Sequence, residues 1–71
     1  MSRPLQDWRP LSVSHRGQVW SGAWELAIGM VNVSSAYGAQ SAPAGADAKR
    51  TAESLLVDLV EGWLARTRRR I

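Results

Sequence analysis

The chain lacks several residue types on which small proteins often depend. Its 71 residues include no cysteine, no phenylalanine and a single histidine, His15. Disulfide bonds are therefore impossible, and the Cys and His ligands of a structural zinc site are missing. There is no run of about 18 apolar residues that could span a membrane, and the first residues lack the apolar core of a secretory signal. These absences predict a cytoplasmic protein that holds no metal and no cofactor.

Motifs that would indicate catalysis are also missing. There is no P-loop, no paired-glycine nucleotide fingerprint and no EF-hand spacing. Residues 38–42 resemble the G-x-S-x-G motif but lack its closing glycine. We expect His15 to be an exposed turn residue, and Asp58 and Glu61 to belong to a solvated helix face. The sequence predicts that the protein is not an enzyme.

Positive charge is concentrated at the end of the chain. The formal net charge is +3, from nine basic and six acidic residues. Four of the basic residues form one cluster: Arg66, Arg68, Arg69 and Arg70. The other five basic residues stand against six acidic ones, so the rest of the chain has a net charge of −1. The cluster is a candidate contact for the phosphates of nucleic acid, and a solubilising tail is the other interpretation.

Apolar residues alternate with small or polar ones across residues 13–43, which is typical of strands. Even-numbered positions form one apolar face: Trp20, Trp24, Leu26 and Ile28. Gly29 then suits a hairpin turn, and Val31 and Val33 resume the alternation. A further short strand is expected at 39–42. We predict a meander of three or four antiparallel strands.

A helix is expected to follow at about residues 48–66. Asp47 is a suitable N-cap, because its carboxylate can accept hydrogen bonds from the N–H groups of the first turn. Residues at spacings of three and four form one apolar stripe: Ala48, Ala52, Leu55, Leu56, Leu59, Trp63 and Leu64. A sheet with one apolar face and a helix with one apolar stripe pack as two layers. The expected fold class is therefore α+β, an antiparallel meander packed by one C-terminal helix (β-β-β-α).

This single domain is expected to occupy residues 13–71. Residues 1–12, before it, carry two prolines and no clear periodicity. We interpret them as an extended N-terminal leader that folds back by inserting Trp8 and Leu11 against the domain.

The aromatic content favours self-association. The chain has four tryptophans, and one helix cannot easily cover two of them on the sheet together with the aliphatic residues of the strands. The first interpretation of Trp20, Trp24 and Trp63 is that they belong to the core. Excess apolar surface on so short a chain nevertheless predicts a homodimer, with Trp20, Trp24 and Tyr37 as the candidate self-association surface. The main hypothesis is a non-enzymatic, self-associating protein-interaction module. The alternative is an accessory nucleic-acid-binding protein that uses the C-terminal arginines.

The pattern of glycines and apolar residues resembles a family of small uncharacterised proteobacterial proteins. The shared elements are G-x-W at 22–24, G-M-V-x-V at 29–33, Y-G at 37–38 and a leucine-rich helix around 55–59. These are turn glycines and core positions. The resemblance implies a bacterial protein of the expected fold, and it implies no activity and no binding residue.

Overall fold

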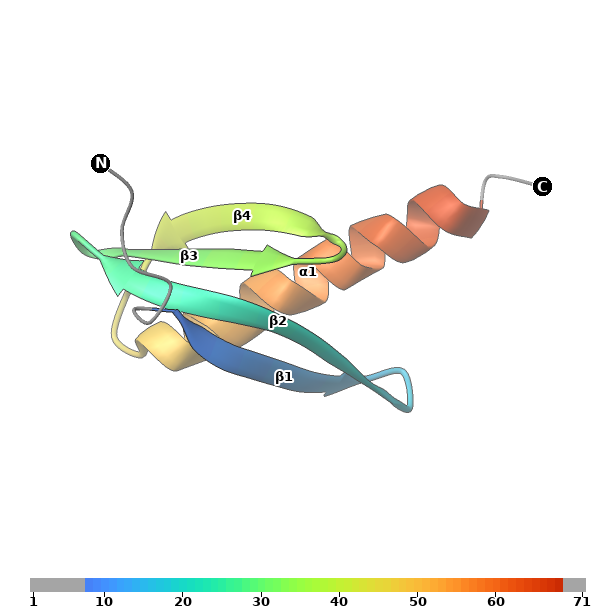
Figure 1. The fold of residues 1–71 in the computed structure, drawn as a ribbon, viewed down its shortest axis with the longest axis horizontal. Helices are drawn as coiled ribbons and strands as arrows, with labels where there is room; N and C mark the ends of the chain where they lie inside the picture. The colour runs from blue at the N-terminus through green and yellow to red at the C-terminus, as the bar shows by residue number, and fades with distance from the viewer. Residues whose placement is uncertain (1–7, 69–71) are drawn as a thin grey trace.

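Four antiparallel strands form one open sheet, and one helix packs on it (Figure 1). The structure is a computed structural model that describes residues 8–68. The elements are β1 (Arg9–His15), β2 (Gln18–Ala27), β3 (Met30–Ser35), β4 (Gly38–Pro43) and α1 (Ala48–Arg68). Each strand pairs with the next along the chain, so the order in the sheet is β1-β2-β3-β4. The fold class is α+β, as the sequence predicts, with the topology β-β-β-β-α.

Two-residue turns set the register of the first two hairpins. Arg16 and Gly17 join β1 to β2 with φ of 54° and 77°, and Ile28 and Gly29 join β2 to β3 with φ of 53° and 72°. Positive φ at both central residues is the type I′ geometry, whose twist matches that of paired strands. The residues that flank the turns are paired, His15 with Gln18 and Ala27 with Met30.

The core lies between one face of the sheet and α1. Trp20 and Trp24 of β2 are each 8% exposed, and Val31 and Val33 of β3 are fully buried beside them. The helix contributes Ala52, Leu55, Leu56 and Val60. The alternation predicted for these strands is confirmed at these positions, and the helical stripe is confirmed at Ala52, Leu55 and Leu56. Val60 was not part of the predicted stripe. Burial of this apolar surface is the main driving force for the fold.

Gly22 allows β2 and β3 to lie close together beneath α1. It stands between Trp20 and Trp24 on the core face, where a Cβ would lie 3.5 Å from Leu56 Cδ1. The same Cβ would lie only 2.9 Å from the backbone oxygen of Ser34 on the neighbouring strand. A side chain at this position would therefore have to displace β3.

The helix begins where the sequence predicts. The N–H of Arg50 donates to Asp47 Oδ1 over 3.1 Å, which confirms Asp47 as the N-cap. Thr51 Oγ1 donates to the carbonyl of Ala44 over 2.8 Å and ties the preceding loop to the first turn. At its other end α1 continues to Arg68, and its last turns run past the β3–β4 turn (Figure 1).

The expected boundary between leader and domain is wrong, because β1 begins at Arg9. Residues 9–12 therefore belong to the sheet, and Leu11 is buried as a strand residue, 2% exposed. The proline at position 10 had argued against a strand, but on an edge strand it needs no hydrogen-bond partner for its nitrogen. Residues 1–7 of the expected leader lie outside the described part of the chain.

Two residues expected on the apolar face of the sheet are exposed instead. Leu26 is 55% exposed, and Ile28, which belongs to the turn rather than to β2, is 100% exposed. The helix covers the tryptophans and valines but leaves this end of the β2–β3 hairpin uncovered. The prediction of surplus apolar surface is confirmed, although the residues that form it differ.

Two glycine-to-alanine substitutions should have opposite effects on stability. Gly22→Ala should lower the free energy of unfolding by roughly 1–3 kcal/mol, because its Cβ would clash with Ser34. Gly62→Ala in α1 should raise it by about 1 kcal/mol, because alanine favours the helix and the nearest atom to its Cβ, Arg66 Nη1, lies 3.6 Å away. Urea denaturation of both variants tests this. If both substitutions changed the free energy of unfolding by the same amount and in the same direction, the contact between Gly22 and Ser34 would not constrain the fold.

Candidate functional site

The residues expected to form a self-association surface lie mainly in the core. Trp20 and Trp24 are buried under α1, and Tyr37, in the β3–β4 turn, is half-buried. Trp20, Tyr37 and Trp63 of the helix pack edge-to-face, with ring centroids 5.3–6.0 Å apart. Trp20 Nε1 also donates to the carbonyl of His15 over 2.9 Å. Their burial contradicts a contact surface made from Trp20 and Trp24, because the helix already uses them.

The arginine cluster lies at the free end of the helix. Arg66 is exposed, and its Nη2 is 3.5 Å from the carbonyl oxygen of Tyr37, a long hydrogen bond. Arg68 is the last residue of α1. Arg69 and Arg70 lie outside the described residues. The described part of the cluster therefore stands on helical turns that reach beyond the sheet.

A cluster that the sequence analysis missed joins the β1–β2 turn to α1. Glu61 Oε2 lies 2.5 Å from His15 Nε2 and accepts a 2.6 Å hydrogen bond from Arg16 Nε, and Glu61 Oε1 accepts a 3.0 Å bond from Arg16 Nη2. The Arg16 contact is bidentate, the strong form of an arginine–carboxylate pair. His15 is half-buried rather than an exposed turn residue, and Glu61 belongs to this ion pair rather than to a solvated face.

These contacts change the titration of the carboxylate. The hydrogen bonds from Arg16 and then His15 lower the pKa of Glu61 to about 2, and their positive charges act in the same direction. With its carboxylate held by Arg16 through both oxygens, Glu61 serves to fix the hairpin to the helix. This arrangement ties the β1–β2 turn to α1.

The face of the sheet opposite α1 carries a polar ladder across three strands. Asn32 Nδ2 donates to Glu25 Oε2 over 2.9 Å, and Ser41 Oγ donates to Asn32 Oδ1 over 2.6 Å. Glu25 is 3% exposed, although the sequence alternation predicts a solvated position. Its burial was not visible in the sequence, where an acid between Trp24 and Leu26 simply reads as the polar face.

Three of the four exposed large apolar residues lie at the tip of the β2–β3 hairpin, and the fourth, Val19, lies at the other end of β2. Leu26, Ile28 and Met30 are 55%, 100% and 37% exposed. We call these three residues the tip patch. Ala27, Ile28, Met30 and Asn32 line a shallow depression at this tip. The patch lies at the end of β2 opposite to the Glu61 tie, so the two features are independent of each other.

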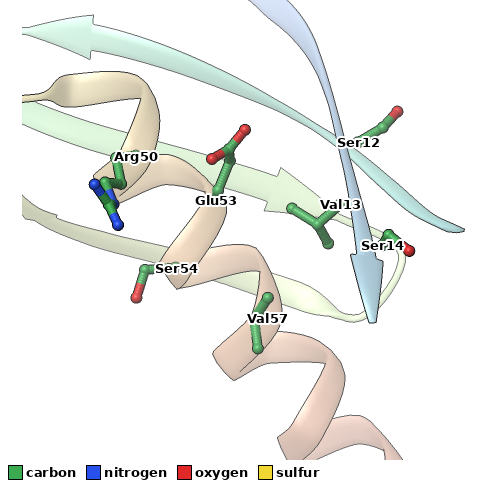
Figure 2. Close-up of a pocket in the computed structure, with 7 residues that line it drawn as sticks. All are labelled: Ser12, Val13, Ser14, Arg50, Glu53, Ser54 and Val57. Carbon is green, nitrogen blue, oxygen red and sulfur yellow. The ribbon is translucent and has the colours of Figure 1, made fainter. Parts of the chain in front are cut away.

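A groove runs between β1 and α1 (Figure 2). Its volume is about 420 Å³, and its lining comes from three consecutive strand residues and from the first half of the helix: Ser12, Val13, Ser14, Arg50, Glu53, Ser54 and Val57. In Figure 2 the side chains of Val13 and Glu53 point into the space between strand and helix. Arg50 and Ser54 also line the groove from the helix.

The described residues show neither a metal centre nor a membrane helix. Within residues 8–68, no group of three or more His, Cys, Asp or Glu residues is placed to hold a metal ion. No helix in the same range is both long enough and apolar enough to cross a membrane. The tip patch and the groove are therefore the candidate functional surfaces of the described chain.

Comparison with known proteins identifies no relative: no family model, no curated protein and no solved structure matches this chain. The resemblance to small proteobacterial proteins stays a prediction. The function has to be inferred from the surfaces themselves.

The Glu61 tie should make stability depend on pH. The pKa of Glu61 is lower in the folded chain (about 2) than in an unfolded one (about 4.3). Ionised Glu61 therefore stabilises the fold fully at pH values above its pKa in the unfolded chain. That contribution should be lost as the pH falls from about 4.3 towards about 2. Wild type should be more stable than Glu61→Gln at pH 7, and the two should converge near pH 2.

Urea denaturation at a series of pH values measures this difference. Asp58→Asn is a matched control, because Asp58 is an exposed acid on the same helix. The control should follow the wild type at every pH. If the difference in free energy of unfolding between wild type and Glu61→Gln does not shrink between pH 7 and pH 2, the ionised carboxylate of Glu61 does not stabilise the fold.

Proposed function

We propose that the protein is a non-enzymatic interaction module that forms a homodimer through the tip patch. A single observation carries this proposal: Ile28 is 100% exposed and has a φ of 53°. Cysteine-free composition favours a reducing compartment such as the bacterial cytoplasm for this association.

The conformation of Ile28 is unfavourable for its residue type. A β-branched side chain in the left-handed region is an outlier, and the first central position of a type I′ turn normally holds Asn, Asp or Gly. The left-handed conformation costs an L-residue roughly 1–2 kcal/mol. Burial in a partner is the benefit that would offset both this strain and the exposure of the side chain.

The neighbours of Ile28 flank it on the two faces of the hairpin. Leu26 pairs with Val31 on the face on which α1 packs, and Met30 pairs with Ala27 on the opposite face. Leu26 precedes the turn and Met30 follows it, and both are exposed on the same hairpin. Apolar side chains grouped in this way on a small domain are typical of a protein contact. A two-fold contact would use the patch twice and would bury the same three residues of both copies.

Replacement of Ile28 separates association from folding. Ile28→Asn should stabilise the monomer by about 1 kcal/mol, because asparagine is favoured in this turn. The same change should abolish the dimer, since it removes the centre of the patch. Sedimentation velocity measures association, and thermal denaturation at low protein concentration measures stability.

The control is Val19→Thr, which changes an exposed apolar residue at the far end of β2, 70% exposed. This variant should dimerise like the wild type. A wild-type protein that remains monomeric at high micromolar concentration would refute the proposal. So would an Ile28→Asn variant that still dimerises.

Nucleic-acid binding through the C-terminal arginines is the second candidate. It is supported by the position of Arg66 and Arg68 on the last turns of α1, which extend beyond the sheet. Such a cluster neutralises phosphates without reading base sequence.

This second function predicts a steep dependence on salt. Replacement of Arg66, Arg68, Arg69 and Arg70 by glutamine should abolish binding to a fluorescent single-stranded oligonucleotide. For the wild type, the logarithm of the binding constant should fall linearly with that of the salt concentration. Arg9→Gln is the control, because Arg9 lies on β1 over the Trp24 ring. Equal binding by the cluster variant and the control would exclude the arginines as the contact.

A further inference from the structure

The outer edge of β1 has free backbone groups. In the described sheet β1 pairs only with β2, and the pair that flanks its two-residue turn is His15 with Gln18. In a type I′ hairpin this flanking pair is hydrogen-bonded, and hydrogen-bonded and non-hydrogen-bonded pairs then alternate along the strand. Odd-numbered residues of β1 therefore bond to β2. The N–H and C=O groups of Ser12 and Ser14 point outward.

Proline limits the length of this free edge. Pro10 is also an even-numbered, outward-facing residue, and it has no N–H to donate. A complete set of donors and acceptors is thus available only at Ser12 and Ser14. An added strand would gain four backbone hydrogen bonds there, two at each serine.

The groove between β1 and α1 lies beside this edge (Figure 2). Val13, between the two serines, points towards the helix and is half-buried. Val57 of the helix lines the opposite side and is also half-buried. These two side chains provide an apolar contact for a residue placed opposite Val13. A free strand edge beside a helix is the arrangement used for recognition by strand addition.

The charge on the groove indicates what kind of segment fits. Two charged residues line the groove, Arg50 and Glu53. Arg50 is exposed, whereas Glu53 is half-buried and points into the groove, and among the described residues its carboxylate has no ion-pair partner. A basic side chain beside it would be complementary. We propose that the groove binds an extended segment of another protein as an additional strand antiparallel to β1, with an apolar residue opposite Val13 and a basic residue opposite Leu11.

The antiparallel direction fixes the order of these residues. The segment runs from the His15 end of β1 towards Arg9, so the residue opposite Val13 comes before the residue opposite Leu11. The recognised pattern is apolar-x-basic. The x residue lies opposite Ser12, and the residue before the apolar one lies opposite Ser14. This surface is separate from the tip patch, so the inference does not depend on the proposed homodimer.

A blocked, fluorescently labelled hexapeptide, TTVTKT, tests the pattern. Its valine should lie opposite Val13 and its lysine beside Glu53. Fluorescence anisotropy should show saturable binding, and amide NMR spectra should show shifts at Ser12 and Ser14.

Replacing the lysine by glutamate in the peptide should weaken binding about fivefold. Glu53→Lys should reverse the preference between the two peptides. Asp58→Lys, with the same change in charge away from the groove lining, should leave the preference unchanged.

Methylation of the peptide backbone tests strand addition without altering the protein. An N-methyl group on the threonine between valine and lysine removes the donor opposite Ser12, and it should weaken binding by about tenfold. An N-methyl group on the valine, whose N–H points away from β1, should have little effect.

Three results would overturn the proposal. The first is no saturable binding of TTVTKT, and the second is equal sensitivity to both methylations. The third is slow hydrogen exchange of the Ser12 and Ser14 amides in the protein without peptide, caused by a second copy of the chain. That result would mean that the edge of β1 pairs with another copy of itself. Ile28→Asn should bind the peptide as wild type does. A wild-type protein that is monomeric and still binds the peptide would disprove only the tip-patch dimer.

Discussion

The structure depends on the packing of α1 across the centre of β2. Leu56 lies over Gly22, between Trp20 and Trp24, in the same buried core. This contact allows one helix to bury both tryptophans and the two valines of β3 in a chain of 71 residues. A chain of this size buries a smaller share of its surface than a larger one, so few other arrangements would supply enough core.

The two type I′ turns show how one local geometry serves two purposes. At the first turn Arg16 has a left-handed backbone, but its guanidinium binds Glu61 through two hydrogen bonds and fixes the hairpin to α1. At the second turn Ile28 has nearly the same φ and no covering element. The first turn is thus part of the domain's stability. The second is better explained by a contact outside the chain.

The two edges of the open sheet are short and contain proline, which limits pairing with other chains. On β1 the restriction is local, because Pro10 blocks one outward position and leaves Ser12 and Ser14 complete. The adjoining groove adds two valines and an acid, so an added strand would meet both an apolar residue and a charge. Recognition at this edge would be selective in sequence and limited in length.

Much of the fold follows from the sequence itself. The alternation in β2 and β3, the N-cap at Asp47 and the stripe of α1 depend on local spacing, which a sequence displays directly. Leu11 and Val13 alternate with serines and could have revealed β1, but Pro10 obscured it. Two features were decided only by tertiary structure: the Glu61 tie and the exposure of the tip patch. Each depends on where α1 crosses the sheet. Arg16 and Glu61 are 45 positions apart, and nothing in the sequence indicates that they will meet.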